Sequence, residues 1–217
     1  MKPLFWLVVA LVLLAVLALG VLFAVTWIEH RQARKSELMQ AAMIGSAAKA
    51  PADTAVVYFS RSGNTALAAR HVAMRLDAEV IALEAPDYRL GLTGLTQALK
   101  DANALKDSED ALPDIVPSRV EMSSFKTVWL GSPVWLYSPA PPIWAFVENN
   151  RFDGLKVVLF NTFNSHFGDD HIAEFKARVM ARGAISFEHK YILRGRMTQQ
   201  LTPEEMLQAI DHEWFGD

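Results

Sequence analysis

The sequence predicts an α/β domain in which a five-stranded parallel sheet is covered by helices on both faces. Five apolar segments of strand length alternate with helix-like segments between residue 54 and the C-terminus. The first, residues 54–60, contains a continuous apolar run rather than an alternating pattern, which is typical of a strand buried on both faces. Strands that alternate with helices are joined by right-handed crossovers and form a parallel sheet. The 217 residues allow one such domain and an appendage.

The appendage is an uncharged apolar segment, residues 3–28. An apolar helix of about 20 residues spans roughly 30 Å, the thickness of the hydrocarbon core of a bilayer. Trp6 and Trp27 fall near its two ends, where aromatic rings favour the membrane interface. Because the run exceeds the roughly 7–15 apolar residues of a signal peptide, we expect an uncleaved transmembrane helix. The predicted organisation is an anchor with a basic flank over residues 1–35, a linker over 36–53 and the domain over 54–217.

The charges are distributed unevenly along the chain. The formal net charge is −3, so no basic field indicates nucleic acid as a partner. The first 35 residues contain four Lys or Arg against one acidic residue, which leaves 17 basic and 23 acidic residues elsewhere. Arg31, Arg34 and Lys35 follow the apolar segment, whereas only Lys2 and the terminal amine precede it. The positive-inside rule therefore favours a single-pass protein of the inner (cytoplasmic) membrane with its domain in the cytoplasm.

The chain contains no cysteine. This excludes disulfides, thiolate catalysis, iron–sulfur clusters and cysteine-ligated zinc. A bound organic cofactor is then an economical source of redox chemistry.

The elements of the domain follow from hydrophobic patterning and from capping signals. Proline at a helix start favours a helix over residues 143–149. Thr202 as N-cap, with Glu205 completing a capping box, predicts a last helix over residues 203–212. Residues 107–124 are polar and contain two prolines, which predicts an irregular connection. The other expected helices are residues 66–76, 95–105 and 169–181, and the expected strands are residues 54–60, 78–83, 127–131, 155–160 and 184–193.

Between the first strand and the first helix lies a hydroxyl-rich turn, Ser60-Arg61-Ser62-Gly63-Asn64-Thr65. The first backbone N–H groups of a helix have no partner within the helix, and the helix dipole adds partial positive charge there. The glycine allows close approach of an anion, the polar side chains add donors, and the arginine adds charge if it turns inward. The turn lacks the Gly-Lys-Ser/Thr ending of a P-loop and the three spaced glycines of a dinucleotide fingerprint. It therefore predicts a different phosphate site, with a capped turn that binds no ligand as the alternative.

The turn after the third strand is rich in proline and aromatic residues: Gly131-Ser132-Pro133-Val134-Trp135-Leu136-Tyr137-Ser138-Pro139-Ala140-Pro141-Pro142-Ile143. By itself such a turn is equally consistent with a rigid connection. Together the two turns resemble the flavodoxin-like family, whose phosphate loop is Ser/Thr-x-Ser/Thr-Gly-Asn-Thr and whose bacterial members carry Gly-Ser-Pro-x-Trp…Pro-Ala-Pro-Pro. The resemblance covers residue 54 to the C-terminus and implies FMN as the cofactor and the strand order 2-1-3-4-5.

In that strand order the ligand binds where the order reverses, so the turns after strands one and three should share it. The prolines hold peptide groups fixed against the flavin, and Trp135 or Tyr137 offers a flat face for stacking. The turn after strand four, residues 161–168, is the third contact expected from the family, although its Asn-Ser-His-Phe content departs from the common pattern. The expected FMN-binding residues are Ser60, Arg61, Ser62, Gly63, Asn64, Thr65, Ser132, Pro133, Val134, Trp135, Tyr137, Thr162, Phe163 and His166.

Several further side chains have alternative interpretations. His166 is either a proton donor to a flavin or a polar loop residue that faces water. It does not predict a metal site with the neighbouring acidic residues and His171, because acidic residues at a helix start are ordinary capping. Lys190, Arg194 and Arg196 form a small basic group that we interpret as a solvated face, with an NADPH phosphate or an acidic partner as the alternative.

Two functions fit the resemblance. The first is a membrane-tethered electron carrier between a reductase and a membrane-associated acceptor. The second is an FMN-dependent NAD(P)H:quinone oxidoreductase, or a quinone-linked dehydrogenase of the protoporphyrinogen-oxidase type. The sequence contains no separate nicotinamide-binding domain, which favours the carrier. A tethered interaction module that has lost its flavin is a third possibility, against which the intact phosphate loop argues.

Overall fold

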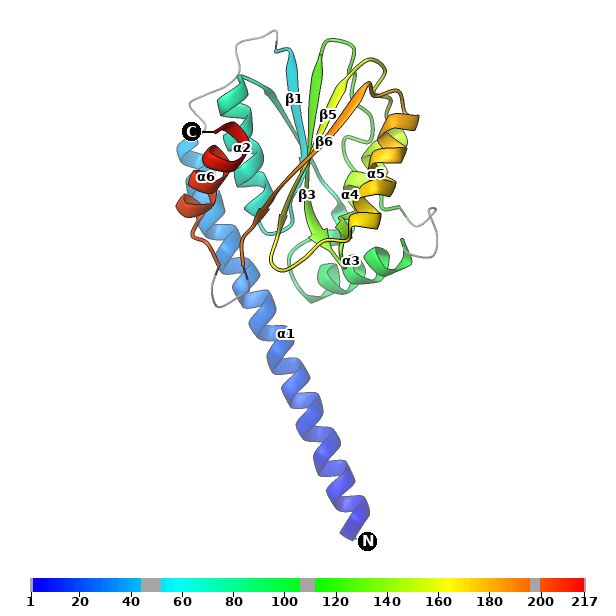
Figure 1. The fold of residues 1–217 in the computed structure, drawn as a ribbon. Helices are drawn as coiled ribbons and strands as arrows, with labels where there is room; N and C mark the ends of the chain where they lie inside the picture. The colour runs from blue at the N-terminus through cyan, green and yellow to red at the C-terminus, as the bar shows by residue number, and fades with distance from the viewer. Residues whose placement is uncertain (1, 44–51, 106–111, 196–199, 217) are drawn as a thin grey trace.

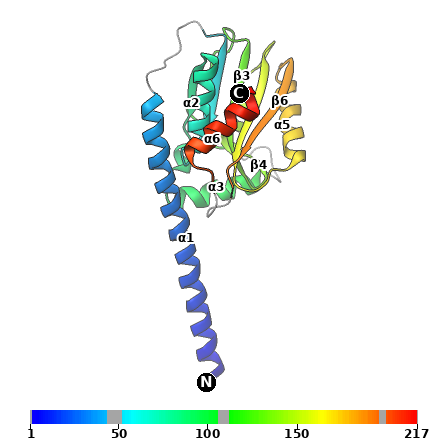
Figure 2. The ribbon, with the colours of Figure 1, turned by 60° about the vertical axis from the view of Figure 1, so that its left-hand side comes forward.

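The computed structural model describes residues 2–43, 52–105, 112–195 and 200–216. It has three layers, with the sheet between two sets of helices and a long N-terminal helix that projects from one end (Figures 1 and 2). The helices are α1 (Lys2–Met43), α2 (Asn64–Leu76), α3 (Leu92–Ala104), α4 (Pro141–Asn149), α5 (Asp169–Ala181) and α6 (Pro203–Ile210). The strands are β1 (Thr54–Phe59), β2 (Glu79–Leu83), β3 (Thr127–Trp135), β4 (Ser138–Pro139), β5 (Lys156–Phe163) and β6 (Ser186–Leu193).

The main sheet has the order β2-β1-β3-β5-β6, and every neighbouring pair in it is parallel. The two-residue strand β4 pairs only with β3, in the antiparallel direction. Without β4, the order is 2-1-3-4-5. The predicted flavodoxin-like fold with a five-stranded parallel sheet is therefore confirmed.

The two faces of the sheet bury separate apolar cores. On one face, α2 and α6 pack with side chains such as Leu67 and Met206 fully buried. On the other face, α4 and α5 bury Ile143 and Phe175. Figure 1 shows these helix pairs on opposite sides of the strands. Burial on both faces explains why β1 is continuously apolar.

The described elements differ from the predicted ones mainly at the strand ends. The third strand was expected to end at residue 131, but β3 continues to Trp135 and turns back into β4. The fourth strand likewise runs on to Phe163 instead of ending at residue 160. The last helix changes at residue 211 into a π-helical turn, Asp211–Phe215. The predicted capping box of Thr202 and Glu205 is present, with both reciprocal hydrogen bonds.

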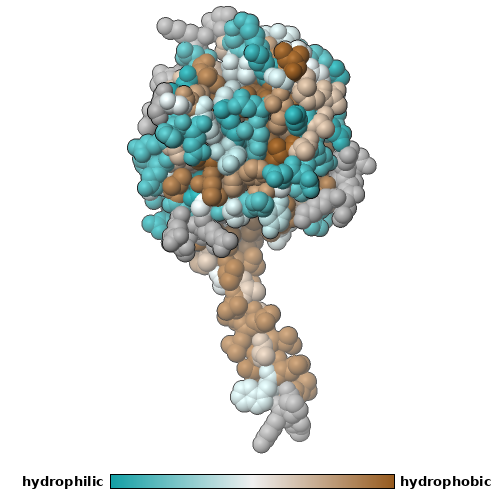
Figure 3. All heavy atoms as spheres, in the orientation of Figure 1, coloured by the Kyte–Doolittle hydropathy of each residue, from teal (hydrophilic) through white to brown (hydrophobic). Residues whose placement is uncertain are grey.

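The helix α1 has a free half and a packed half. By length and composition, its segment Leu4–Lys35 is long and apolar enough to cross a membrane. Both a membrane anchor and a signal sequence have these properties. Residues 4–24 are largely exposed and form the apolar stalk below the domain in Figure 3. Further along, Ala33 is buried, and α1 packs against α2 and α6. The helix also includes the first eight residues of the predicted linker, whereas residues 44–51 lie outside the described residues.

Candidate functional site

A cavity of about 410 Å³ lies at the carboxyl ends of the strands. The turns that follow β1, β3 and β5 form most of its wall, and α1 and the segment after β6 complete it. This volume lies within the usual range of small-molecule and cofactor pockets. Its described lining residues are Val25, Ile28, Ser60, Arg61, Ser62, Asn64, Thr65, Pro133, Val134, Trp135, Leu136, Tyr137, Thr162, Phe163, Asn164, Ser165, His166, Arg194 and Gln200.

The turn after β1 is shaped by Gly63. Its φ of 86° lies in the left-handed region, which favours glycine, and its N–H donates to Oγ of Ser60 over 3.1 Å. Its carbonyl accepts the N–H of Leu67 over 2.9 Å, so the helix α2 begins directly behind the turn. Asn64 donates through Nδ2 to Oγ of Ser62 over 3.4 Å. The turn therefore presents hydroxyls, an amide and the N-terminus of a 13-residue helix to one end of the cavity.

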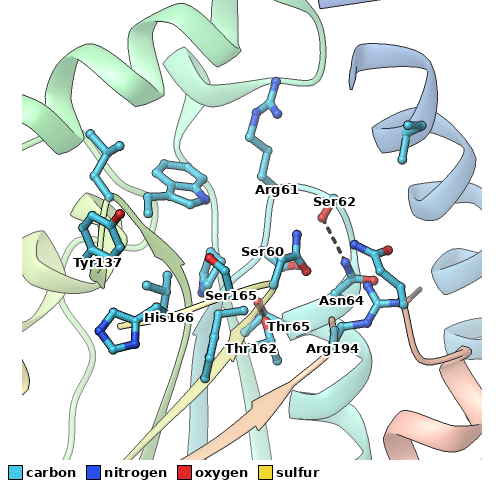
Figure 4. A pocket seen from close by; sticks show the side chains of 18 of the residues that line it. Ser60, Arg61, Ser62, Asn64, Thr65, Tyr137, Thr162, Ser165, His166 and Arg194 are labelled. Carbon is cyan, nitrogen blue, oxygen red and sulfur yellow. Dashed lines mark hydrogen bonds between the residues drawn. The ribbon is translucent and has the colours of Figure 1, made fainter. Parts of the chain in front are cut away.

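Two other side chains of this turn behave differently. Thr65 is buried, and its Oγ1 shares a hydrogen bond of 2.8 Å with Oγ1 of Thr162, which ties the start of α2 to the end of β5. Arg61 points away from the rest of the turn (Figure 4), and its Nη2 donates to the carbonyl of Gly91 over 3.0 Å. The inward turn that would add the charge of Arg61 to the phosphate loop is not adopted.

The turn after β3 is a hairpin. Leu136 and Tyr137 have φ values of 47° and 75°, both in the left-handed region, and they reverse the chain between β3 and β4. Ser132 supports the hairpin from below, because its Oγ accepts the N–H of Ala140 and donates to the carbonyl of Pro133, each over 2.8 Å. The proline-rich turn that the sequence suggested is thus a short β-ribbon, whose tip carries the half-exposed Tyr137.

The aromatic residues of the hairpin have different surroundings. The ring of Trp135 makes edge contacts with Phe59 and Tyr88, at centroid distances of 5.7 and 5.6 Å. These contacts fix the indole between the core and the cavity. Tyr137 instead meets His166 of the turn after β5 at a centroid distance of 5.8 Å. The two rings stand together at one end of the cavity, away from Ser62 and Asn64 (Figure 4).

The turn after β5 is held by a buried polar relay. Asn161 is fully buried, and its Nδ2 donates to the carbonyl of Ser132 over 3.0 Å. Its Oδ1 then accepts a hydrogen bond of 2.8 Å from Nε2 of His189 in β6. Burial lowers the pKa of His189 to about 4, and the carboxylate of Asp169 opposes this shift more weakly. A neutral His189 therefore holds the amide of Asn161 in one orientation and links β3, β5 and β6 beneath the cavity.

Of the fourteen predicted cofactor-binding residues, the structure places twelve on the cavity wall. Gly63 shapes the turn and Ser132 supports the hairpin, but neither lines the cavity. Sequence reasoning did not select Arg194, which was assigned to a solvated face. That interpretation is wrong, because Arg194 is 5% exposed and lines the cavity. Arg196, from the same basic group, lies outside the described residues.

Val25 and Ile28 of α1 also line the cavity, although the sequence suggested only a membrane role for this helix. Their apolar character gives no signal that distinguishes a pocket wall from a lipid-facing surface. Within the described ranges, no three His, Cys, Asp or Glu side chains gather closely enough to hold a metal ion.

Comparisons with known proteins agree with the fold. A putative flavoprotein from Bacteroides uniformis has a TM-score of 0.57 and 20% identity, over 74% of this chain and 98% of that chain. A flavoprotein from Lactobacillus acidophilus, solved in complex with FMN, has a TM-score of 0.51 and 21% identity, over 64% of this chain and 93% of that chain. No curated protein matches the chain. The sequence model of the flavodoxin family matches residues 53–206, which include every strand of the sheet and the three turns around the cavity. The chain therefore belongs to the flavodoxin family.

Proposed function

We propose that this chain is a membrane-tethered FMN protein that carries electrons between a reductase and a membrane-associated acceptor. The observation that carries the proposal is the position of the cavity. It has the polar turns of a flavodoxin-family site, and it lies next to the point where the free apolar half of α1 begins.

The cavity residues fit FMN in their chemistry. At one end, Ser60, Ser62 and the N-terminus of α2 provide the hydroxyl and backbone donors that a phosphate requires. At the other end, the hairpin residues Trp135 and Tyr137 offer aromatic surface to a flavin ring. When bound, FMN would supply one-electron and two-electron redox chemistry, and the protein would control access to it and its potential. The side chains of the wall would bind and orient the cofactor and would exclude water from it.

The described lining residues favour a carrier over an enzyme with its own acid–base chemistry. They include one histidine, His166, and no Asp, Glu or Lys. Within the described wall, a carboxylate or a lysine amine that would act as a general base on a bound substrate is therefore absent. The half-exposed Tyr137 lies at the rim, where a partner protein reaches the cofactor edge. The mildly acidic domain suits docking to a basic face of a reductase.

A quinone-linked oxidoreductase is the second candidate, and the wall formed by α1 favours it. Residues 4–24 of α1 form a helical segment about 30 Å long, which matches the thickness of the hydrocarbon core of a bilayer. With these residues in the membrane, Val25 and Ile28 lie at its surface, and the cavity that they line opens there. An apolar electron acceptor that diffuses within the bilayer then reaches the flavin without crossing water.

One experiment separates the two candidates. The full chain in lipid nanodiscs is loaded with FMN and mixed anaerobically with NADPH or NADH, with and without a water-insoluble quinone. The carrier proposal predicts that the flavin stays oxidised until a separate flavin reductase is added. Rapid bleaching by NAD(P)H alone, with steady turnover on the quinone, would instead establish the enzyme and refute the pure carrier.

The proposed location is the inner membrane with the domain in the cytoplasm. Arg31, Arg34 and Lys35 on the domain side of the span support this orientation over the reverse. Reporter fusions at the C-terminus test it. A cytoplasm-active reporter should be active and a periplasm-active reporter inactive, and the opposite result would reverse the orientation.

A further inference from the structure

Arg194 is held rigidly at the edge of the cavity. It directly follows β6, and its backbone N–H donates to the carbonyl of Phe163 over 2.8 Å. Its carbonyl accepts the N–H of Leu201 over 2.8 Å, and its Nη2 donates to the carbonyl of the same residue over 3.0 Å. The side chain is 5% exposed. These contacts fix the guanidinium in place before any ligand arrives.

Part of this guanidinium is without a partner. Nε and Nη1 are buried and form no hydrogen bond with any residue that the structure describes. A buried cation without a counterion is unfavourable, and burial accordingly lowers the pKa of Arg194. Arginine nevertheless remains charged in proteins. The folded chain therefore keeps a positive charge and two N–H donors without a partner in a residue that lines the cavity, and an anion would satisfy both.

The position of Arg194 beside the turn after β1 points to a phosphate group as the anion. In Figure 4 it lies beside Asn64 and the N-terminal end of α2, at the end of the cavity opposite Tyr137 and His166. Arg61, the cation within the turn itself, points away and donates to Gly91. The hydroxyls of the turn, the helix N-terminus and the guanidinium thus converge on one volume.

We propose that Arg194 binds the terminal phosphate of FMN and sets the preference of the site for FMN over riboflavin. A guanidinium presents N–H donors in a planar fork that matches two phosphate oxygens. The negative phosphate supplies the counterion that the buried cation lacks. This inference rests on FMN as the cofactor, as proposed above. Arg194, which follows the edge strand β6, would supply a charged donor to the phosphate. The turn after β1 would supply the neutral donors.

The phosphate of a lipid headgroup could bind the same guanidinium, so the experiment must distinguish it from the phosphate of FMN. Arg194 also lines a neighbouring cavity of about 290 Å³ with Trp27, Arg31 and Lys35 of α1. An anionic headgroup at the membrane surface would meet the same cations. The two sources differ because a lipid phosphate has no reason to alter the ratio of FMN to riboflavin affinity.

The test uses the full chain, stripped of flavin, in a neutral detergent. FMN and riboflavin are titrated against the wild type, Arg194→Met and Arg194→Lys, and binding is followed by the quenching of flavin fluorescence. Arg194→Met keeps the length of the side chain and removes its charge. Arg151→Met is the matched control, because Arg151 is exposed and pairs with Asp153 away from the cavity.

The expected result is a loss of FMN affinity of about 10- to 100-fold in Arg194→Met, the size of one charge-assisted contact. Riboflavin affinity should change less than about twofold, because riboflavin has no phosphate for the guanidinium to bind. Arg194→Lys should keep part of the FMN preference, and Arg151→Met all of it. If Arg194→Met does not fold, the FMN-to-riboflavin ratio of the lysine variant decides, since lysine keeps the charge but loses the planar fork.

Other outcomes would overturn one proposal or the other. Equal losses for FMN and riboflavin in Arg194→Met, or no loss for either, would refute the phosphate contact. Unchanged FMN affinity with reduced binding of the chain to anionic phosphatidylglycerol vesicles would assign Arg194 to lipid instead. A wild type that binds neither flavin would refute FMN as the cofactor, which is a failure of the proposed function and not only of Arg194.

Discussion

Replacement of Gly131 by alanine tests the packing at the strand end that carries the hairpin. Gly131 lies between Tyr58 of β1 and Phe160 of β5 in the sheet. A Cβ added at Gly131 would lie 2.8 Å from Cβ of Tyr58 and still closer to Cζ of Phe160. The Phe160 ring is fully buried against Trp129 and Trp214, so it has little room to move away.

Overpacking of this kind costs about 1–3 kcal/mol, and the fixed neighbours place Gly131→Ala in the upper part of that range. For a domain of this size, about 2–3 kcal/mol lowers Tm by roughly 4–12 °C. Thermal unfolding of the flavin-free full chain, followed by tryptophan fluorescence, measures the change. Phe160→Leu removes the ring atoms that clash with the added Cβ, and it is combined with Gly131→Ala in a double-mutant cycle. It should lower Tm by itself but recover at least about 1 kcal/mol when combined with Gly131→Ala. Strictly additive effects would refute the predicted steric conflict.

Three further changes test other parts of the structure. Because burial depresses the pKa of His189 in the fold to about 4, its contribution to stability is present above pH 6.5 and is lost as the pH falls from 6.5 toward 4. The free energy of unfolding should fall by about 1 kcal/mol at pH 5, since the ring keeps some contact with water. His189→Gln retains a donor for Asn161 and should abolish this loss of stability at low pH. Urea titrations at several pH values measure the effect. Thr202→Ala removes the hydroxyl that caps α6 and should cost about 1 kcal/mol in thermal unfolding, whereas Thr202→Ser should restore most of it. Deletion of residues 4–24 should move the chain from the membrane fraction to the soluble fraction, and an unrelated apolar helix of equal length should restore its membrane retention.

Each of these changes has a result that would count against its reasoning. A His189→Gln variant with the same acid sensitivity as the wild type would show that another group titrates. Equal stability of the alanine and serine variants at Thr202 would show that the hydroxyl does not stabilise the start of α6. A truncated chain that resists alkaline extraction from membranes would show that the domain itself binds the bilayer.

The strands and the turn after β1 could be predicted because their signals are local. The buried strand β1 needs a continuous apolar run, and Gly63 needs the left-handed conformation at a position that the sequence marks with a glycine. The capping box at Thr202 likewise depends on residues within one helical turn. These features were correct or nearly correct from the sequence alone.

The hairpin after β3 could not be predicted for the opposite reason. A tight turn with two left-handed residues is normally marked by Asn-Gly or Asp-Gly, but here Leu136 and Tyr137 adopt it. Their conformation is imposed by contacts distant in sequence, including the hydrogen bond of 2.7 Å from the N–H of Gly168 to the carbonyl of Tyr137. Local propensity therefore predicted a loop where the tertiary structure holds a ribbon.

The burial of Arg194 was missed because it depends on the whole fold. In the sequence it belongs to a short polar segment, which resembles a solvated strand end. In the structure the end of β6 meets the end of β5 and the segment before α6, and these cover the side chain. The closeness of a buried arginine to the turn after β1 becomes visible only when residues 130 positions apart in the chain are brought together.

The packing of α1 was also outside the reach of the sequence. The helix is apolar on all sides over residues 4–28, so no amphipathic stripe marks the face with Val25 and Ile28 that contacts the domain. The membrane and a protein core select the same residue types, and only the arrangement in space separates them.

The most direct test of the central claim is to isolate the full chain from membranes and to identify the flavin that it carries. After gentle detergent extraction and purification, the protein is denatured, and the released flavin is separated and quantified against the protein. The proposed function predicts FMN in amounts equimolar to the chain, recovered from the membrane fraction. Membrane-extracted protein that carries no flavin and takes up none when FMN is added would contradict it.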